Sequence, residues 1–351
     1  MSRRTSPAVS ARRRLGRTSV EVTRLGFGSA ALGNLYDVID DTAATATVTA
    51  ALDAGVGYFD TAPFYGYGLS EQRLGCALAS SAHEEVVLSS KVGRLLTPRT
   101  GPARSDQGFV GALPFDPVFD YSYDGVMQSV EASLRRLSRS RIDILLLHDV
   151  GAQTHGKENH TNIFEIAMSG GYVALDELRR AGDIGAVGLG VNETAVCLEA
   201  MERGDFDCFL LAGRYTLLEQ NALDDLLPAC LEREISIIIG GPYNSGILAE
   251  GPRSGAHYDY VAASSSMIDR VKSIRAICRM HEVPLAAAAL QFPLRHSAVA
   301  TVIPGARTEK EVHESAEWIR HPIPENLWSD LVEAGLLDPR SLLSPPTGGS
   351  Q

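Results

Sequence analysis

Residues 55–75 read GVGYFDTAPFYGYGLSEQRLG and join a short apolar run, a loop and a helix. The apolar run ends in Asp60, and a turn of Thr, Ala and Pro leads into an aromatic loop that carries Tyr65. We expect the following helix to begin at Ser70. A strand that ends in an acid, followed by a loop that presents a phenol, is typical of a strand-to-helix junction built for chemistry. A tight loop would bring Asp60 and Tyr65 to one place.

The same alternation of a short apolar strand and a helix recurs along the chain. We expect a hairpin at about 14–22, a first barrel strand at 23–28, and eight strand candidates that each precede a helix. Such alternation indicates right-handed βαβ units and a parallel sheet. Eight units in 351 residues favour an α/β fold, the (β/α)8 TIM barrel, with an N-terminal hairpin and a C-terminal helix. A doubly wound open sheet is the alternative, but the first strand lacks GxGxxG with an acid on the second strand.

Two long connections and two tails stand outside this alternation. Residues 93–123 are rich in Gly, Pro, Asp and aromatics, and we expect them to form a loop over a site. We expect a second loop at 149–163 and infer that both connections select the substrate. The basic, Ser-rich residues 1–13 and the residues 339–351 are expected to be disordered tails. One domain therefore spans 14–338.

Charge and composition limit the partners of this chain. The net charge is -11, which argues against nucleic-acid binding because that needs a cationic face. No apolar run can span a bilayer and no secretion segment is present, so we expect a cytoplasmic protein with a small-molecule substrate and no membrane partner. The oligomeric state is left open. The five cysteines are odd in number and form no CxxC, which indicates reduced thiols. They are Cys76, Cys197, Cys208, Cys230 and Cys278.

Four polar residues are expected to meet at the ends of neighbouring strands. Asp60, Lys91 and His148 end, or nearly end, the second, third and fourth strands, and Tyr65 follows the second. A buried ammonium beside a phenol favours the phenolate and lowers the phenol pKa. We therefore expect Lys91, held by Asp60, to make Tyr65 a general acid or base near neutral pH. His148 would donate a hydrogen bond to a substrate oxygen. Taken singly, each residue also has a structural interpretation, such as a helix cap for Asp60 or a loop histidine for His148.

These motifs resemble the aldo-keto reductase family over about residues 14–335. The most specific parts are GYFDTAPFYGYGLSEQRLG, the strand-end Lys91, DILLLHD, IGAVGLGVN and TVIPGARTEKEV. The resemblance implies an eight-stranded α/β barrel and a nicotinamide dinucleotide bound without a Rossmann domain. It implies no metal. It also implies a catalytic tetrad of Asp60, Tyr65, Lys91 and His148.

The resemblance further implies where the cofactor lies. Asn192 would bond the nicotinamide carboxamide, and the backbone of residues 240–248, GGPYNSGIL, would cradle the pyrophosphate. The stretch IPGARTEKE would hold the adenosine end. The expected cofactor contacts are Gly28, Ser29, Asn192, Gly240, Pro242, Ser245, Gly246, Leu248, Gly305, Arg307, Thr308 and Glu311.

Three departures from the family pattern bear on the cofactor. Many members have Lys at the position of Gly305 and Arg at that of Glu311, and those cations bind the 2'-phosphate of NADP. A carboxylate there accepts a hydrogen bond from a ribose hydroxyl and repels a phosphate, so we expect NAD, with NADP as the alternative because Arg307 is a cation. In addition, the aromatic residue that stacks on the nicotinamide is replaced by Gly240, and the usual Gln by Ala212.

Three segments resemble a narrower branch of the family, DYSYDGVMQSVEASLRRL, FLLAGRYTLLEQ and GGPYNSGILAEG. The branch includes bacterial D-threo-aldose (L-fucose) 1-dehydrogenases and pyridoxal 4-dehydrogenase. It implies oxidation of a cyclic hemiacetal, an aldose such as L-fucose or D-arabinose or else pyridoxal, to a lactone with hydride transfer to NAD(P). One alternative is an NADPH-dependent aldehyde or ketone reductase. The other is a nucleotide-binding accessory subunit with little turnover, like the potassium-channel β-subunits of this superfamily.

Overall fold

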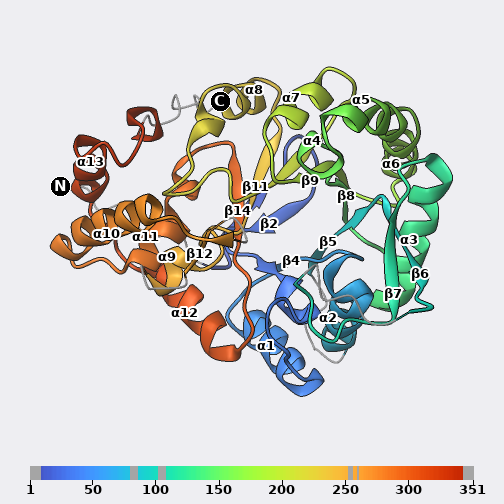
Figure 1. The fold of residues 1–351 in the computed structure, drawn as a ribbon, viewed down its shortest axis with the longest axis horizontal. Coiled ribbons are helices and arrows are strands. Elements are labelled where there is room, and N and C mark those ends of the chain that lie inside the picture. Colours follow the sequence, from blue (N-terminus) through green and yellow to red (C-terminus); the bar gives the residue numbers. More distant parts are fainter. Residues whose placement is uncertain (1–8, 80–85, 102–107, 252–255, 259–260, 343–351) are drawn as a thin grey trace.

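Eight parallel strands form the centre of the part of the chain that the structure, a computed structural model, describes (Figure 1). That part comprises residues 9–79, 86–101, 108–251, 256–258 and 261–342. The strands pair in the order β14-β11-β10-β9-β8-β5-β4-β3. Their bounds are β3 Phe27–Gly28, β4 Tyr58–Asp60, β5 Val87–Val92, β8 Ile144–His148, β9 Ala186–Val191, β10 Cys208–Ala212, β11 Ser236–Gly240 and β14 Val299–Ile303.

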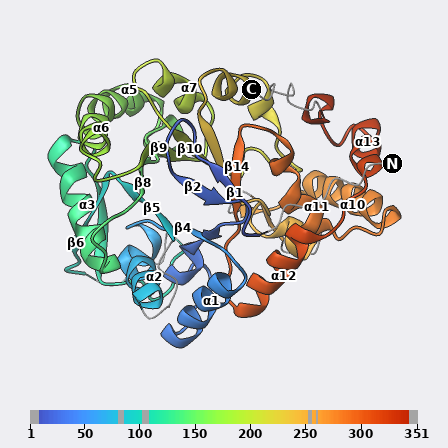
Figure 2. The ribbon, with the colours of Figure 1, turned by 180° about the vertical axis from the view of Figure 1, so that it is seen from behind.

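The two edge strands of this sheet meet each other. The backbone N–H of Gly26 donates to the carbonyl of Val302 at 2.9 Å, and that of Gly28 donates to Pro304 at 3.0 Å. The sheet therefore closes on itself into a ring of strands with helices around it (Figure 1), and seen from behind the strands β1 and β2 lie across the centre of this ring (Figure 2). The expected (β/α)8 barrel is confirmed, and the open-sheet alternative is wrong.

Helices surround the barrel, and side-chain caps mark where several of them begin. Asp40 accepts from the N–H of Ala43 at the start of α1, and Ser122 accepts from that of Gly125 at the start of α3. The helices are α1 Asp41–Asp53, α2 Leu69–Ala79, α3 Tyr123–Leu137, α6 Tyr172–Ala181, α7 Ala195–Met201, α8 Leu226–Glu232, α9 Ile247–Glu250, α10 Ser265–Met280, α11 Leu285–Gln291, α12 Glu309–Arg320 and α13 Glu325–Glu333. Short 3-10 turns cover η1 Ser29–Gly33, η2 Tyr65–Gly68, η4 Asn221–Leu223 and η5 Pro293–Arg295.

Apolar side chains fill both the barrel interior and the layer between strands and helices. Inside the barrel, Tyr58, Leu146 and Ile238 pack together with Leu15 and Val22 of the N-terminal hairpin. The hairpin therefore closes one end of the barrel. The carboxyl ends of the parallel strands lie at the opposite end, which is the open mouth. Among the described residues, no helix is long and apolar enough to cross a membrane.

The expected tails are shorter than the sequence suggested. Strand β1 (Arg12–Arg14) pairs antiparallel with β2 (Glu21–Thr23), and Val9 is buried, so the prediction of a tail was wrong for residues 9–13. The basic side chains fit a strand because they point to solvent while the backbone pairs. At the other end, Pro339–Leu342 form the turn η6, so the prediction of a tail was wrong there too. Residues 1–8 and 343–351 lie outside the described residues.

The two long connections also differ from the expected loops. Residues 94–98 (β6) pair with residues 115–119 (β7) as an antiparallel ribbon, and residues 102–107 lie outside the described residues. The prediction of a loop at 149–163 was wrong, because α4 (Ala152–His155) and α5 (Lys157–Ile166) run into a π turn (Ala167–Gly171) and then α6. Buried Phe164 anchors this helical path, which the polar composition concealed.

Candidate active site

The strand ends place three of the predicted catalytic residues at the barrel mouth. Asp60 is the last residue of β4 and His148 the last of β8, while Lys91 lies one residue before the end of β5. Alternate residues of a strand face the same side, so these three follow interior residues such as Tyr58 and Leu146. Tyr65 begins the turn η2 just after β4. The structure therefore brings all four side chains to one region.

Lys91 is the centre of this cluster. Its Nζ donates to Asp60 Oδ2 at 2.6 Å, to the carbonyl of Thr61 at 2.9 Å and to the Tyr65 hydroxyl at 3.1 Å. Only 2% of the Lys91 side chain is exposed. Ser89 donates to the other oxygen of Asp60 at 2.7 Å, which orients the carboxylate. The three donors of the ammonium are thus all used, and Asp60 does not serve as a helix cap.

Sequence reasoning missed three residues that support Lys91. Thr61 supplies a carbonyl, Ser89 holds Asp60, and Gly190 of β9 leaves room for the lysine stem, because a Cβ at Gly190 would lie 3.1 Å from Lys91 Cε. The positions of Ser89 and Gly190 could have been found from the strand period alone. Ser89 lies two residues before Lys91, and Gly190 lies two before Asn192, so each shares a face with a predicted residue.

Burial and charge act in opposite directions on this cluster. Burial favours the neutral amine of Lys91, but Asp60 and Tyr65 outweigh it and raise the lysine pKa, so the ammonium is kept. For Tyr65 the balance is reversed. Burial raises the phenol pKa more than Lys91 lowers it. The prediction of a lowered Tyr65 pKa was therefore wrong. It considered the nearby Lys91 ammonium but not the removal of the phenol from water, which disfavours the phenolate.

His148 completes the cluster as a neutral ring. Its imidazole lies edge-on to the Tyr65 ring, with 6.3 Å between centroids, and is nearly buried. Burial lowers the pKa of His148 well below its usual range, and the cations Arg94 and Lys91 lower it further. A neutral imidazole carries one N–H, so His148 can donate a hydrogen bond to an oxygen placed near Tyr65.

The opposite side of the mouth is lined by glycines and sharp turns. After Gly240 at the end of β11, the backbone takes positive φ at Gly241 (56°), Asn244 (45°), Ser245 (58°) and Gly246 (92°). Successive residues of this kind turn peptide N–H groups toward one concavity, which suits a phosphate. Pro242 and Leu248 are buried and fix the two ends of this turn.

The remaining predicted cofactor positions differ in how open they are. Gly28 and Gly305 form a parallel bridge, and a Cβ at Gly305 would come no closer than 3.6 Å to its nearest neighbour, the carbonyl of Gly28. Asn192 follows β9 at the mouth, where its carbonyl accepts from Arg214 Nε at 2.5 Å. Ser29 is fully buried and bonds Ser70 at 2.8 Å, so its side chain is committed to packing.

Comparison with known proteins agrees with this geometry. The family model described as the aldo/keto reductase family matches residues 24–335. The chain belongs to the aldo/keto reductase family. It is 43% identical to a pyridoxal 4-dehydrogenase of Microbacterium luteolum, covering 93% of this chain and 98% of the relative. It is 38% identical to a D-threo-aldose 1-dehydrogenase of Pseudomonas sp, covering 95% and 98%. The aldo-keto reductase AKR11C1 from Bacillus halodurans, in its holo form, superposes with a TM-score of 0.72 at 25% identity, covering 96% and 99%.

Members of the aldo/keto reductase family use nicotinamide cofactors, and the glycines and positive-φ residues at the mouth of this barrel suit a dinucleotide. The turn 240–246 would hold the pyrophosphate, and the bridged glycines Gly28 and Gly305 add backbone that carries no side chain. Three residues after Gly305, Thr308 caps α12 by accepting from the N–H of Glu311 at 3.3 Å.

At the start of α12, Arg307 lies between two carboxylates. Arg307 Nη1 donates to Asp37 at 2.6 Å and Nη2 donates to Glu311 at 2.8 Å. The backbone N–H of Arg307 also donates to Glu311 at 2.7 Å. The guanidinium is therefore neutralised from both sides, which the sequence did not reveal because Asp37 lies 270 residues away along the chain.

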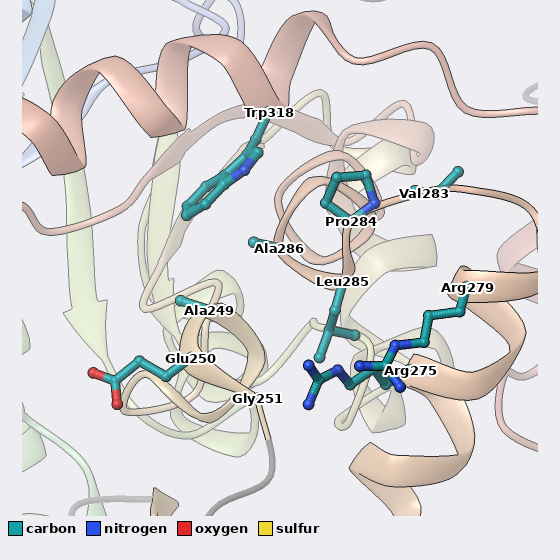
Figure 3. A pocket seen from close by; sticks show the side chains of 10 residues that line it. All are labelled: Ala249, Glu250, Gly251, Arg275, Arg279, Val283, Pro284, Leu285, Ala286 and Trp318. Carbon is teal, nitrogen blue, oxygen red and sulfur yellow. The ribbon is translucent and has the colours of Figure 1, made fainter.

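A separate cavity of about 270 Å³ lies outside the barrel, bounded by Trp318 of α12, by Arg275 and Arg279 of α10 and by Leu285 of α11 (Figure 3). None of its lining residues is one of the predicted catalytic or cofactor-binding residues. Within the described ranges, no group of three His, Cys, Asp or Glu residues could hold a metal ion. All five cysteines are described, and all are free thiols.

Proposed function

We propose that this protein oxidises the anomeric carbon of a cyclic hemiacetal, an aldose such as L-fucose or D-arabinose or else pyridoxal, and releases a lactone. The observation that carries the proposal is the Lys91 ammonium, 2.6 Å from Asp60 and 3.1 Å from the Tyr65 hydroxyl, with neutral His148 beside it. Two relatives, a pyridoxal 4-dehydrogenase at 43% identity and a D-threo-aldose 1-dehydrogenase at 38%, support the class of substrate.

In this proposal each side chain has one task. Tyr65, as phenolate, accepts the proton of the anomeric hydroxyl while the C–H hydride leaves and the C–O bond becomes C=O. His148 donates a hydrogen bond to that oxygen. Lys91 stabilises the phenolate, and Asp60 keeps Lys91 charged and in place. The oxidised nicotinamide would supply the hydride acceptor at its C4 and a positive charge beside the phenol.

We propose NAD rather than NADP as the preferred cofactor. A 2'-phosphate at the start of α12 would face the carboxylates of Asp37 and Glu311, and the one cation between them, Arg307, is already paired with both. A ribose 2'-hydroxyl has no such charge and can donate to a carboxylate oxygen. The charge arrangement therefore favours the dinucleotide without the extra phosphate.

The test is a panel of steady-state assays with the purified protein. L-fucose, D-arabinose, L-galactose and pyridoxal are offered with NAD and with NADP, and lactone formation is followed together with cofactor reduction. We expect turnover with at least one hemiacetal and a higher kcat/KM for NAD. If none of these hemiacetals leads to reduction of NAD or NADP, the proposal is wrong.

The alternatives give different results in the same assays. An aldehyde or ketone reductase would turn over open carbonyls with NADPH and bind NADP more tightly than NAD. An accessory subunit would bind dinucleotide with very slow turnover on every substrate. The closed ion-pair network around Lys91 favours turnover, because a binding role needs no proton-transfer group.

A further inference from the structure

A second buried ion pair lies beside the catalytic cluster. Arg94 follows Gly93, whose φ of 96° turns the chain immediately after β5. Its guanidinium lies between two aromatic rings, 4.0 Å from the centroid of Phe64 and 4.6 Å from that of Phe119. Arg94 is 8% exposed and pairs with Asp149, which is 17% exposed. In the described part of the chain, Arg94 Nε is buried without a hydrogen-bond partner.

The Arg94–Asp149 pair is connected to His148 in two ways, through the peptide bond between His148 and Asp149 and through the Asp149 carboxylate, which lies near the imidazole. Asp149 directly follows His148, and its Oδ2 lies 3.5 Å from His148 Nε2. The backbone of Asp149 has a φ of 53°, a conformation that non-glycine residues seldom adopt. The Tyr121 hydroxyl donates to the carbonyl of His148 at 2.6 Å and lies 3.2 Å from that of Asp149. Arg94, which begins β6, and Tyr121, two residues after the end of β7, thus both belong to the surroundings of His148.

We propose that Arg94 and Asp149 act as a positioning pair that holds His148 in place as an uncharged hydrogen-bond donor. The inference rests on the proposed function for its catalytic meaning. Asp149 alone would attract a proton to the adjacent imidazole, and Arg94 cancels that attraction by occupying the carboxylate. A protonated His148 would add a third cation beside Lys91 and would oppose the binding of an oxidised nicotinamide.

Several charged or titratable groups face His148 or the pair, and each belongs to a different element. Lys91 of β5 and Arg94 of β6 both lower the His148 pKa, after burial, which lowers it most. Around them lie Tyr65 of η2, Glu193 after β9, which acts on Asp149, and His155 of α4, which contacts Tyr121. Of these carboxylates, Asp149 is the one within 4 Å of a His148 ring nitrogen, so its pairing with Arg94 acts in the same direction as burial and Lys91.

The experiment measures the protonation of His148 directly and needs no substrate. The chain has nine histidines, so the His148 signal in a spectrum of the 13C-histidine-labelled full chain is assigned by its loss in His148→Asn. We expect the pKa of His148 to rise in Arg94→Met, to stay low in Arg94→Lys, which keeps the cation, and to return low in Arg94→Met/Asp149→Asn. Arg94→Gln is the second variant, with the same expected rise, should Arg94→Met not fold.

The matched control is Arg99→Met on the same ribbon. Arg99 is 6% exposed, pairs with Asp116 at 3.0 Å and stacks over Tyr67, but makes no contact with His148. We expect it to leave the His148 signal unchanged. In activity assays with the accepted hemiacetal, Arg94→Met should lower kcat/KM at about pH 6 by about tenfold relative to about pH 8, beyond the ratio of the wild type.

Two results would overturn the inference. One is a His148 pKa that does not move in Arg94→Met and Arg94→Gln. The other is a rise that persists when Asp149 is also removed, because the attraction would then not come from that carboxylate. Since the spectrum is recorded without substrate, failure of the hemiacetal assays leaves this readout intact, and the two proposals fail separately.

Discussion

The two halves of the barrel mouth differ in what they present to a ligand: one presents charged side chains and the other presents glycine backbone. On one side β4, β5 and β8 carry Asp60, Lys91 and His148 at or next to their ends, each no more than 6% exposed. In the other half, which runs from β3 next to β4 round to β11, β3 ends in Gly28 and β11 ends in Gly240. The first half presents buried charge, and the second presents bare backbone.

The contrast separates the two demands that a hydride-transfer site makes. Proton transfer needs side chains whose pKa values are set by burial and by neighbouring charges. Holding a dinucleotide needs backbone that can approach a phosphate, and a Cβ would block that approach. Changes on the first half should therefore alter kcat, whereas changes on the second should alter cofactor binding and choice.

The strongest test of this division is Tyr65→Phe. Loss of the phenol oxygen removes proton exchange, and we expect kcat to fall by about 10³-fold, the scale of general acid–base catalysis. The affinity for NAD, measured by fluorescence titration, should stay nearly unchanged because the ring is kept. Normal turnover in this variant would exclude Tyr65 from the acid–base role.

Lys91→Met should have a smaller effect on kcat, about 10²-fold, because the phenol is kept but its cation is lost. It should also lower the free energy of unfolding by about 3 kcal/mol, since Asp60 is left buried without its partner. Denaturant unfolding followed by circular dichroism measures this loss. Lys272→Met, which breaks an exposed pair with Asp269, should be neutral. Equal stability of the two variants would contradict the buried-pair account.

The direction of the pH dependence follows from the raised Tyr65 pKa. Burial keeps the phenol protonated at neutral pH, and oxidation needs the phenolate. We expect kcat/KM for hemiacetal oxidation to increase with pH, by up to about tenfold per pH unit below the phenol pKa. Reduction of the product should show the opposite slope, because it needs the protonated phenol. An oxidation rate that falls as pH rises would exclude Tyr65 as the base.

The smallest expected effect concerns cofactor choice. In Asp37→Asn/Glu311→Gln, Arg307 loses both anionic partners and becomes available to a phosphate. The ratio of kcat/KM for NADP to that for NAD should rise by about fivefold, which corresponds to about 1 kcal/mol. Glu314→Gln is the control on the same helix, because Glu314 pairs with Lys310 instead. A change in kcat without a change in this ratio would show that the two halves are not separate.

Some features of this protein were determined by its sequence alone. The barrel and the meeting of Asp60, Lys91 and His148 follow from local patterns, because parallel strands place their ends on one face and alternate residues share a side whatever the loops do. The tertiary structure decided the rest. The raised pKa of Tyr65 depends on how far packing excludes water from the phenol. The second carboxylate that pairs with Arg307 comes from Asp37, far away in the sequence. The helices that replace the expected loop at 149–163 depend on the burial of Phe164. Burial and contacts between distant residues exist only once the chain has closed on itself.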